Sequence, residues 1–245
     1  MMLPKIFSPT VLLILALFCF STTGCKNSPD YGESVEVEIT TDKGVITLFL
    51  FNETPLHKQN LIEKANSHYY DSMLFHRVIK GFVIQTGDPA SKEAVPGALY
   101  GESPSPNIPA EIKADFHHIR GVVGAAREGD EVNPEKASSG SHFYIVQGYG
   151  DPVTDSMLNE AEKRLGKVIE PRFVKHYKEE GGSPRLDGNY TIFGYVVSGM
   201  DVVDAIAEME TDDNDRPKED VRILSMKVIN LDKKQTKKYY DNYAK

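Results

Sequence analysis

The chain of 245 residues contains no tryptophan and only two cysteines, Cys19 and Cys25. Both cysteines lie close to the N-terminus, so the rest of the chain has no free thiol and cannot form a disulfide. A domain without disulfides has to rely on a sizeable hydrophobic core. We therefore expect one large domain, with room for an insertion.

Positive charge is also scarce, because the formal net charge is −8. A protein that binds nucleic acid through its phosphates shows a basic stripe. This sequence offers one short basic cluster, formed by the pairs Lys233-Lys234 and Lys237-Lys238. Nucleic acid is therefore excluded as an expected partner, and we interpret residues 233–245 as a solvated basic tail.

The apolar run at residues 11–20 is too short to cross a membrane, since a transmembrane helix takes about 20 residues. Its length and the preceding Lys5 are typical of a signal peptide. The small residues that lead into Cys25 resemble a bacterial lipoprotein signal. This resemblance implies a signal peptide over residues 1–24, a lipid on Cys25 and a polar tether over residues 25–33. The alternative is an ordinary signal peptide with an incidental cysteine.

A lipid on Cys25 would anchor the protein in the bacterial cell envelope. Lys26 follows this cysteine, in place of the aspartate that retains enterobacterial lipoproteins at the inner membrane. We therefore expect the protein at the outer membrane or on the periplasmic face, attached to the membrane through its N-terminal lipid.

Short strands dominate the rest of the chain. Val35, Val37 and Ile39 alternate with polar residues, which is typical of a half-buried strand, and residues 45–51 continue it as a hairpin. The spacing predicts helices over residues 54–67 and 200–209, and it predicts a helical insertion at about residues 150–183. Seven or eight short strands joined mostly by loops indicate a mainly β domain over residues 34–232. A closed antiparallel barrel would remove their edges.

Residues 74–88 contain two short apolar runs that are separated by Lys80-Gly81 and closed by Thr86-Gly87-Asp88. Their valines, isoleucines and phenylalanines favour strands. Arg77 and Gln85 interrupt this apolar pattern, and a buried arginine is unfavourable unless it is paired. We therefore expect these two polar residues to line a groove or to take part in a polar network.

This segment resembles the cyclophilin family of peptidyl-prolyl isomerases. The resemblance is carried by the run Phe75-His76-Arg77-Val78-Ile79-Lys80-Gly81-Phe82-Val83-Ile84-Gln85-Thr86-Gly87-Asp88. Lys80 and Thr86 stand where the family usually has proline and glycine. Further likenesses follow in order at residues 121–126, 139–145, 186–188, 191–194 and 200–203. The fold implied is an eight-stranded antiparallel closed β-barrel capped by two helices, here with a helical insertion.

The resemblance implies catalysis of cis–trans exchange at X-Pro bonds of polypeptides. No bond is made or broken, so no nucleophile, cofactor or metal is expected. Arg77 would stabilise the twisted amide by donating to the proline nitrogen, with Phe82 and Gln85 as the other catalytic residues. The residues that the resemblance implies for substrate binding are Val83, Ala126, His142, Tyr144, Leu186 and Tyr190.

Four positions in the implied groove depart from the family. Tyr144 replaces a phenylalanine and adds a hydroxyl that needs a partner if it is buried. His142 replaces a glutamine, and Tyr190 replaces a histidine of the proline pocket. Arg185 stands where many eukaryotic members have a tryptophan that contacts cyclosporin. We therefore expect weak cyclosporin binding.

The seven histidines do not show the ligand spacing of a metal site. His117 and His118 are adjacent, so on a strand they would face opposite ways.

We expect a monomer that assists the folding of exported proteins. The alternative is a non-catalytic module, a chaperone or scaffold that binds proline peptides without turnover. A purely structural lipoprotein is a third alternative.

Overall fold

The computed structural model describes residues 34–148, 150 and 152–243. The predicted signal peptide, Cys25 and the tether lie outside the described residues. The described elements belong to one compact unit.

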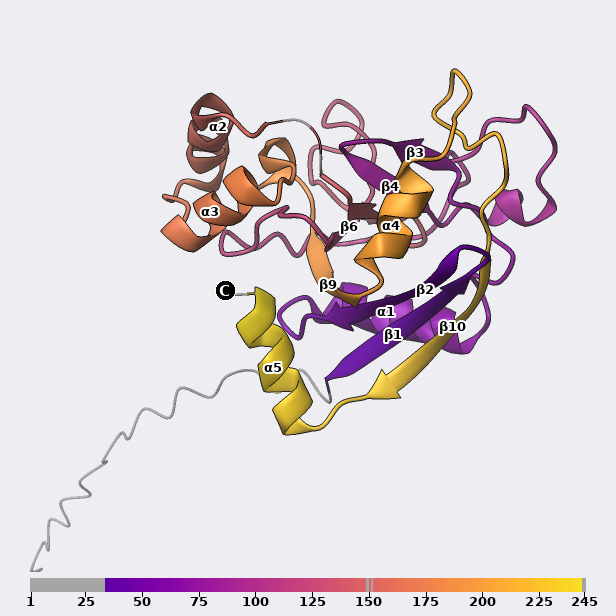
Figure 1. The fold of residues 1–245 in the computed structure, drawn as a ribbon, viewed down its shortest axis with the longest axis horizontal. Helices are drawn as coiled ribbons and strands as arrows, with labels where there is room; N and C mark the ends of the chain where they lie inside the picture. Colours follow the sequence, from indigo (N-terminus) through magenta and orange to yellow (C-terminus); the bar gives the residue numbers. More distant parts are fainter. Residues whose placement is uncertain (1–33, 149, 151, 244–245) are drawn as a thin grey trace, which may run out of the picture. The chain divides into compact units, whose positions relative to one another are not determined.

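Eight antiparallel strands form one curled sheet (Figure 1). Their spatial order is β10-β1-β2-β9-β6-β8-β4-β3. The strands are β1 (Val35–Thr41), β2 (Gly44–Leu50), β3 (Arg77–Ile79), β4 (Val83–Thr86), β6 (Val122–Ala125), β8 (Phe143–Val146), β9 (Ile192–Ser198) and β10 (Ile223–Asn230). Two short strands, β5 (Asn107–Ile108) and β7 (Ser138–Ser139), pair separately.

The sheet is an open half-barrel, so the prediction of a closed barrel is not confirmed. β3 and β10 are its two end strands, and no ladder joins them. The segment before β3 does meet the chain at the start of β10. Phe75 N donates to Val221 O at 2.9 Å, and Ile223 N donates to Met73 O at 2.9 Å. Pairing ends there, because Val78 N bonds instead to Asp215 O in the loop before β10.

The inner face of the sheet holds the larger core. Val37 and Ile39 of β1 are fully buried there, as their alternation predicts. The predicted helices cover this core as α1 (Pro55–Asn66), which contributes Leu61, and α4 (Met200–Ala207), which contributes Val203. Both helices form where the sequence predicts them, because their apolar residues recur at helical spacing.

The outer face holds a second core of different composition. Two helices occupy the predicted insertion, α2 (Asp155–Leu165) and α3 (Pro171–Glu179). Two short 3-10 helices lie elsewhere in the chain, η1 (Pro89–Glu93) and η2 (Pro184–Leu186). Leu158 of α2 and Phe173 of α3 pack in the same cluster as Val122 of β6 and Tyr144 of β8. The insertion therefore adds apolar cover to one face of the sheet.

The C-terminal basic segment forms a helix, α5 (Lys233–Tyr243). Its tyrosines face the protein, since Tyr240 lies 5.0 Å from the Phe49 ring and Tyr243 lies 4.9 Å from the Phe51 ring. The prediction of a solvated tail is wrong for the tyrosines of α5, which pack against the protein. The lysines of the same helix are exposed. In the described part of the chain, none of the helices has the length and apolar character needed to cross a bilayer.

Candidate active site

Three neighbouring strands, β3, β4 and β8, carry four of the expected site residues, namely Arg77, Val83, Gln85 and Tyr144. On β4, the side chains alternate, so that Ile84 enters the inner core while Val83 belongs to the outer cluster. Gln85 follows Val83 on the outer side and pairs across the ladder with Tyr144 of β8. The strand period thus directs the polar Gln85 and the aromatic Tyr144 to one face.

Most of the expected apolar site residues meet in the outer cluster. Its members include Phe82, Val83, Ala126, Tyr144, Leu186 and Tyr190. We call the surface formed by Arg77, Phe82, Gln85, Ala126 and Tyr144 the site face.

A hollow of about 580 Å³ continues the site face past Ala126. Gln85, Ala126 and His142 line it, together with Glu102 and Glu128. Three of the expected site residues therefore border one open space large enough for side chains of a bound peptide.

Arg77 opens β3 directly opposite Gln85. Its Nε lies 3.4 Å from Asp215 Oδ2, and the two side chains are 40% and 43% exposed. No hydrogen bond from its terminal nitrogens to another described residue is present. A guanidinium has five N–H donors, so most of its donors remain free for a ligand. The ion pair orients Arg77 without burying it.

Phe82 lies in the turn between β3 and β4. Its carbonyl accepts hydrogen bonds from Gln147 N at 2.9 Å and Gly148 N at 3.1 Å, which fix the turn. Arg185 stacks over the ring, with its guanidinium carbon 3.9 Å from the ring centroid. This cation–π contact places a positive charge at the exposed edge of the apolar cluster.

The Tyr144 hydroxyl has the partner that its burial requires. Tyr144 is 4% exposed, and its Oη lies 2.9 Å from His118 Nε2. Burial raises the pKa of this phenol well above its usual value, so the hydroxyl keeps its proton. The ring lies against Gly124, where an added Cβ would come within 2.4 Å of the hydroxyl. Only glycine leaves room for the ring at this position.

Asp187 is the centre of a buried polar cluster behind Tyr144. It accepts a hydrogen bond from the His118 backbone at 2.7 Å and from Tyr177 Oη at 2.7 Å. Both His117 Nδ1, at 3.2 Å, and His118 Nδ1, at 2.8 Å, contact the same carboxylate. Burial raises the pKa of Asp187, but the hydrogen bonds from both histidines outweigh it and lower the pKa to about 2.

His117 and His118 are not on a strand, so the condition under which they were expected to face opposite ways does not apply. They lie in an irregular segment before β6, and there both rings turn toward Asp187. Within residues 34–148, 150 and 152–243, no group of three or more His, Cys, Asp or Glu side chains is arranged to hold a metal ion.

Tyr190 forms the far side of the aromatic cluster. Its ring lies 6.0 Å from the Tyr144 ring at 83°, in an edge-to-face arrangement. The guanidinium of Arg127 lies over the Tyr190 ring at 4.8 Å and is paired with Asp130 at 2.7 Å. Tyr190 is therefore held by contacts on two sides.

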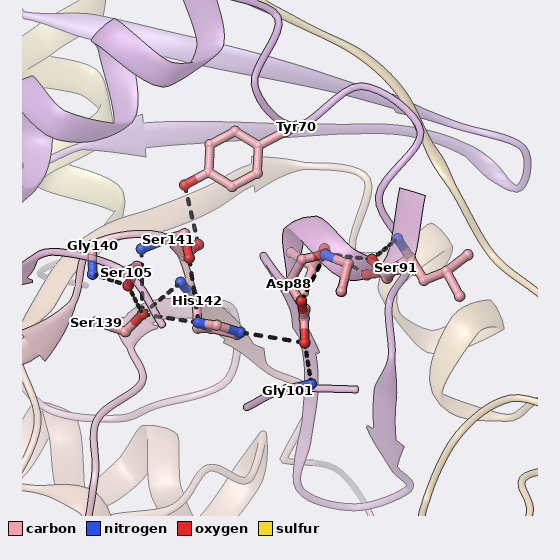
Figure 2. Close-up of polar contacts among 12 residues, drawn as sticks. Tyr70, Asp88, Ser91, Gly101, Ser105, Ser139, Gly140, Ser141 and His142 are labelled. Atoms are coloured by element: carbon pink, nitrogen blue, oxygen red, sulfur yellow. Dashed lines mark hydrogen bonds and ion pairs between the residues drawn. The ribbon is translucent and has the colours of Figure 1, made fainter. Parts of the chain in front are cut away.

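His142 borders the hollow and is held by a polar cluster (Figure 2). Its Nδ1 lies 2.9 Å from Ser139 Oγ, and its Nε2 points toward Asp88 Oδ2 at 4.0 Å. Burial lowers the pKa of His142, although Asp88 opposes this shift. Asp88 in turn accepts from Gly101 N at 2.5 Å, which ties the loop around the hollow to β4.

The two departures within the family motif have structural partners. Lys80 Nζ donates to Glu208 Oε2 at 2.6 Å, and the buried Thr86 hydroxyl donates to Leu74 O at 2.7 Å. Gly87 is kept, since it has φ +106° and an added Cβ would lie 2.1 Å from Ser141 O. The motif therefore keeps its backbone course despite both substitutions.

Sequence reasoning missed three contributors to the site, namely His118, Asp187 and the stacking of Arg185 on Phe82. Asp187 lies within residues 186–188, one of the stretches that resemble the family, and this could have marked it as a buried acceptor. His118 and Asp187 are 69 residues apart, and no local pattern joins them.

The comparisons with known proteins agree with this geometry. The family described as cyclophilin type peptidyl-prolyl cis-trans isomerase/CLD matches residues 36–228. A Staphylococcus saprophyticus protein named as a peptidyl-prolyl cis-trans isomerase is 32% identical over 204 residues, which cover 83% of this chain and 96% of that protein.

Two further relatives differ in size or in sequence. A Streptococcus pyogenes protein named as a bifunctional phosphatase and peptidyl-prolyl cis-trans isomerase is 35% identical over 198 residues. The match covers 79% of this chain but 38% of that longer protein. The crystal structure of a Cryptosporidium parvum cyclophilin type peptidyl-prolyl cis-trans isomerase is similar, with a TM-score of 0.57 and 22% sequence identity. The match covers 81% of this chain and 99% of the Cryptosporidium chain, which shows a shared fold.

Proposed function

The chain belongs to the cyclophilin-type peptidyl-prolyl cis-trans isomerases, and we propose that it accelerates the isomerisation of X-Pro bonds in exported polypeptides on its site face. Its substrates are proline-containing segments of incompletely folded chains, and the protein works as a monomer. The observation that carries the mechanism is Arg77, whose half-exposed guanidinium has free donors beside Gln85 and the apolar cluster.

To catalyse this rotation, the protein has to stabilise the twisted amide more than either planar isomer. Rotation about a peptide bond has a barrier of about 18–20 kcal/mol, because twisting removes the amide resonance. In the twisted state the proline nitrogen is pyramidal and basic, so a fixed N–H donor stabilises it more than either planar isomer. Arg77 keeps its charge and presents such donors.

Most of the remaining site residues have a role that follows from their position. Phe82, Val83 and Leu186 give the proline ring an apolar surface, with Tyr144 as its wall. Gln85 hydrogen-bonds the substrate backbone next to Arg77. Ala126 and His142 border the hollow that takes the residues preceding the proline. This division of roles needs no cofactor, since no covalent bond changes.

A second candidate function is a module that binds proline peptides without turnover. The stacking of Arg185 on Phe82 favours it, because the guanidinium occupies part of the apolar edge that a proline ring would contact.

Exchange spectroscopy by NMR on an Ala-Pro peptide separates the two functions. We expect the domain over residues 34–243 to raise the cis–trans exchange rate in proportion to its concentration. Peptide shifts that titrate while the exchange rate stays at the uncatalysed value would establish the binding module instead. An unchanged rate without binding would rule out both.

We further propose that the protein is exported and held at the outer membrane or the periplasmic face by a lipid on Cys25. This proposal rests on the N-terminal sequence alone. In a Gram-negative host, we expect the full chain in the membrane fraction and the Cys25→Ser variant in the soluble fraction, as followed by immunoblotting. Membrane retention of Cys25→Ser to the same extent as wild type would contradict the lipid anchor.

A further inference from the structure

We propose that Asp187 and His118 are positioning residues that hold Tyr144 in place as the wall of the proline site, and that the helical insertion supports them through Tyr177. The inference rests on the proposed function and assigns a role to the insertion.

The ionised carboxylate of Asp187 sets the direction of the hydrogen bonds in the series Asp187–His118–Tyr144 when the His118 ring is a neutral imidazole. Asp187 is fully buried and stays ionised at neutral pH, because its pKa is lowered to about 2. It can only accept, so His118 Nδ1 carries the proton. In the neutral imidazole Nε2 is then the acceptor, and the Tyr144 hydroxyl donates to it at 2.9 Å. The carboxylate therefore selects the histidine tautomer that binds the phenol.

The hydroxyl end of the Tyr144 ring is closely packed. Gly124 lies against it, with space for no side chain. The His118 ring lies nearly parallel to the Tyr144 ring, with centroids 6.1 Å apart at 22°. A hydroxyl that lost its acceptor here would be buried without a partner, which is strongly unfavourable. The ring would then have to shift, and the wall of the proline site would shift with it.

The insertion supports this series at its far end. Tyr177 of α3 is 1% exposed, and its hydroxyl donates to Asp187 Oδ2 at 2.7 Å. Arg164 of α2 donates from its Nη2 to Pro184 O at 2.6 Å and from its Nε to Asp187 O at 3.1 Å. These contacts hold the turn η2, which carries Leu186 to the site. Both helices of the insertion thus support residues that the substrate is expected to meet.

A mutant cycle tests the positioning role. The variants are His118→Leu, Tyr144→Phe and the double variant, and the exposed His68→Leu is the control, since its side chain is 73% exposed. The readouts are kcat and KM for an Ala-Pro peptide by exchange NMR, and the melting temperature.

We expect His118→Leu to lower kcat/KM about tenfold, because a buried hydroxyl then lacks its acceptor. The double variant should recover to within about threefold of wild type, since a phenyl ring needs no acceptor. Losses that multiply in the double variant would overturn the proposal, as would a His118→Leu variant with a native spectrum and wild-type kcat/KM.

Two further measurements test the proposal if His118→Leu does not fold or if the wild type shows no turnover. If His118→Leu does not fold, Tyr177→Phe is used, because it removes one hydroxyl far from the peptide. We expect it to lower kcat/KM about threefold, by loosening the support of Asp187, and an unchanged kcat/KM would overturn the proposal.

The Tyr144 hydroxyl proton gives the readout that does not depend on turnover. We expect an NMR signal for it in slow exchange with water in wild type, and its loss in Tyr177→Phe and His118→Leu. If wild type catalyses no exchange but shows this signal, the proposed function fails and the positioning of Tyr144 stands. If wild type is active and the signal is absent, the positioning proposal fails.

Discussion

At the scale of single residues, Arg77 of the site face and the neighbouring Arg185 have different surroundings. Arg77 has an ion pair with Asp215, whereas Arg185 is exposed and rests on the Phe82 ring. An exposed cation–π contact contributes about 0.5–1 kcal/mol. A proline ring that packs on Phe82 has to compete with this contact.

We expect Arg185→Ala to bind an Ala-Pro peptide about two- to fivefold more tightly than wild type, because the Phe82 ring is then uncovered. The measurement is an NMR titration that gives the dissociation constant. Arg172→Ala is the matched control, since Arg172 stacks on Phe173 in the insertion at 4.8 Å. Weaker binding by Arg185→Ala would show that the guanidinium contributes to peptide binding.

His76 makes the stability of the domain depend on pH. Burial, with a smaller contribution from His142, lowers its pKa from 6.5 to about 4. Above pH 6.5 both the folded and the unfolded chain hold His76 neutral, so its contribution to stability is complete. Between pH 6.5 and about 4 the unfolded chain takes up the proton first, so stability falls as pH falls.

The expected loss from His76 between pH 6.5 and about 5 is about 2 kcal/mol, at about 1.4 kcal/mol per pH unit. Urea unfolding of wild type and His76→Gln at several pH values measures it, and the variant should lose less stability over this range. His68→Gln is the control, because the side chain of His68 is 73% exposed. Parallel curves for wild type and His76→Gln would contradict the prediction.

The sequence could predict which residues share the site face, and it could not predict what supports them. Arg77 and Gln85 interrupt an apolar pattern, and the ladder pairs them. The motif also identified Tyr144 and the need for a partner to its hydroxyl. The partner itself, His118, depends on contacts between distant segments and on a chain course outside regular structure. Local patterns carry no information of this kind.

At the scale of elements, the C-terminal helix α5 shows how a basic segment can hide an apolar contact. Tyr243 is 5% exposed, and its hydroxyl accepts a hydrogen bond from His117 N at 3.0 Å. Its ring packs on Phe51 and Phe173, so α5 joins the chain just after strand β2 to the insertion helix α3. This helix belongs to the outer core.

We expect Tyr243→Ala to lower the free energy of unfolding by about 3 kcal/mol, because it removes a buried aromatic ring and leaves a cavity. Urea unfolding followed by circular dichroism measures the change. Lys234→Ala serves as the control, because Lys234 lies on the exposed side of the same helix. A Tyr243→Ala variant as stable as the control would show that α5 contributes nothing to the core.

Elements with a clear apolar period were predictable, and elements defined by long-range packing were not. The alternation in β1 and the helical stripe of α4 follow from local sequence. The tyrosines of α5 lie among lysines, so charge concealed their spacing. Closure of the barrel depends on whether β3 and β10 meet, and a loop between them pairs with β3 instead. Strand count alone does not decide that outcome.

At the scale of the whole molecule, the sheet separates two cores with different tasks. The inner core, with α1 and α4, stabilises the half-barrel. The outer core contains residues of the site face, of the insertion and of α5. Substitutions in the insertion can therefore reach the site through Asp187, while the inner core stays unchanged.

The central claim is that Arg77 acts on the twisted amide and contributes little to binding of the planar peptide. Its most direct test is exchange NMR on an Ala-Pro peptide at saturation, with wild type, Arg77→Ala and Arg77→Lys, together with the dissociation constant of each. Asp215→Asn, which loosens the ion pair without removing the guanidinium, is the matched control.

We expect Arg77→Ala to lower the exchange rate on the enzyme about 100-fold, as loss of one transition-state donor typically does, while the dissociation constant changes less than about threefold. Arg77→Lys should be intermediate, because it keeps the charge but loses the fork of donors. An Arg77→Ala variant that exchanges the bound peptide at the wild-type rate would contradict the claim, and so would one that loses affinity and rate in equal measure.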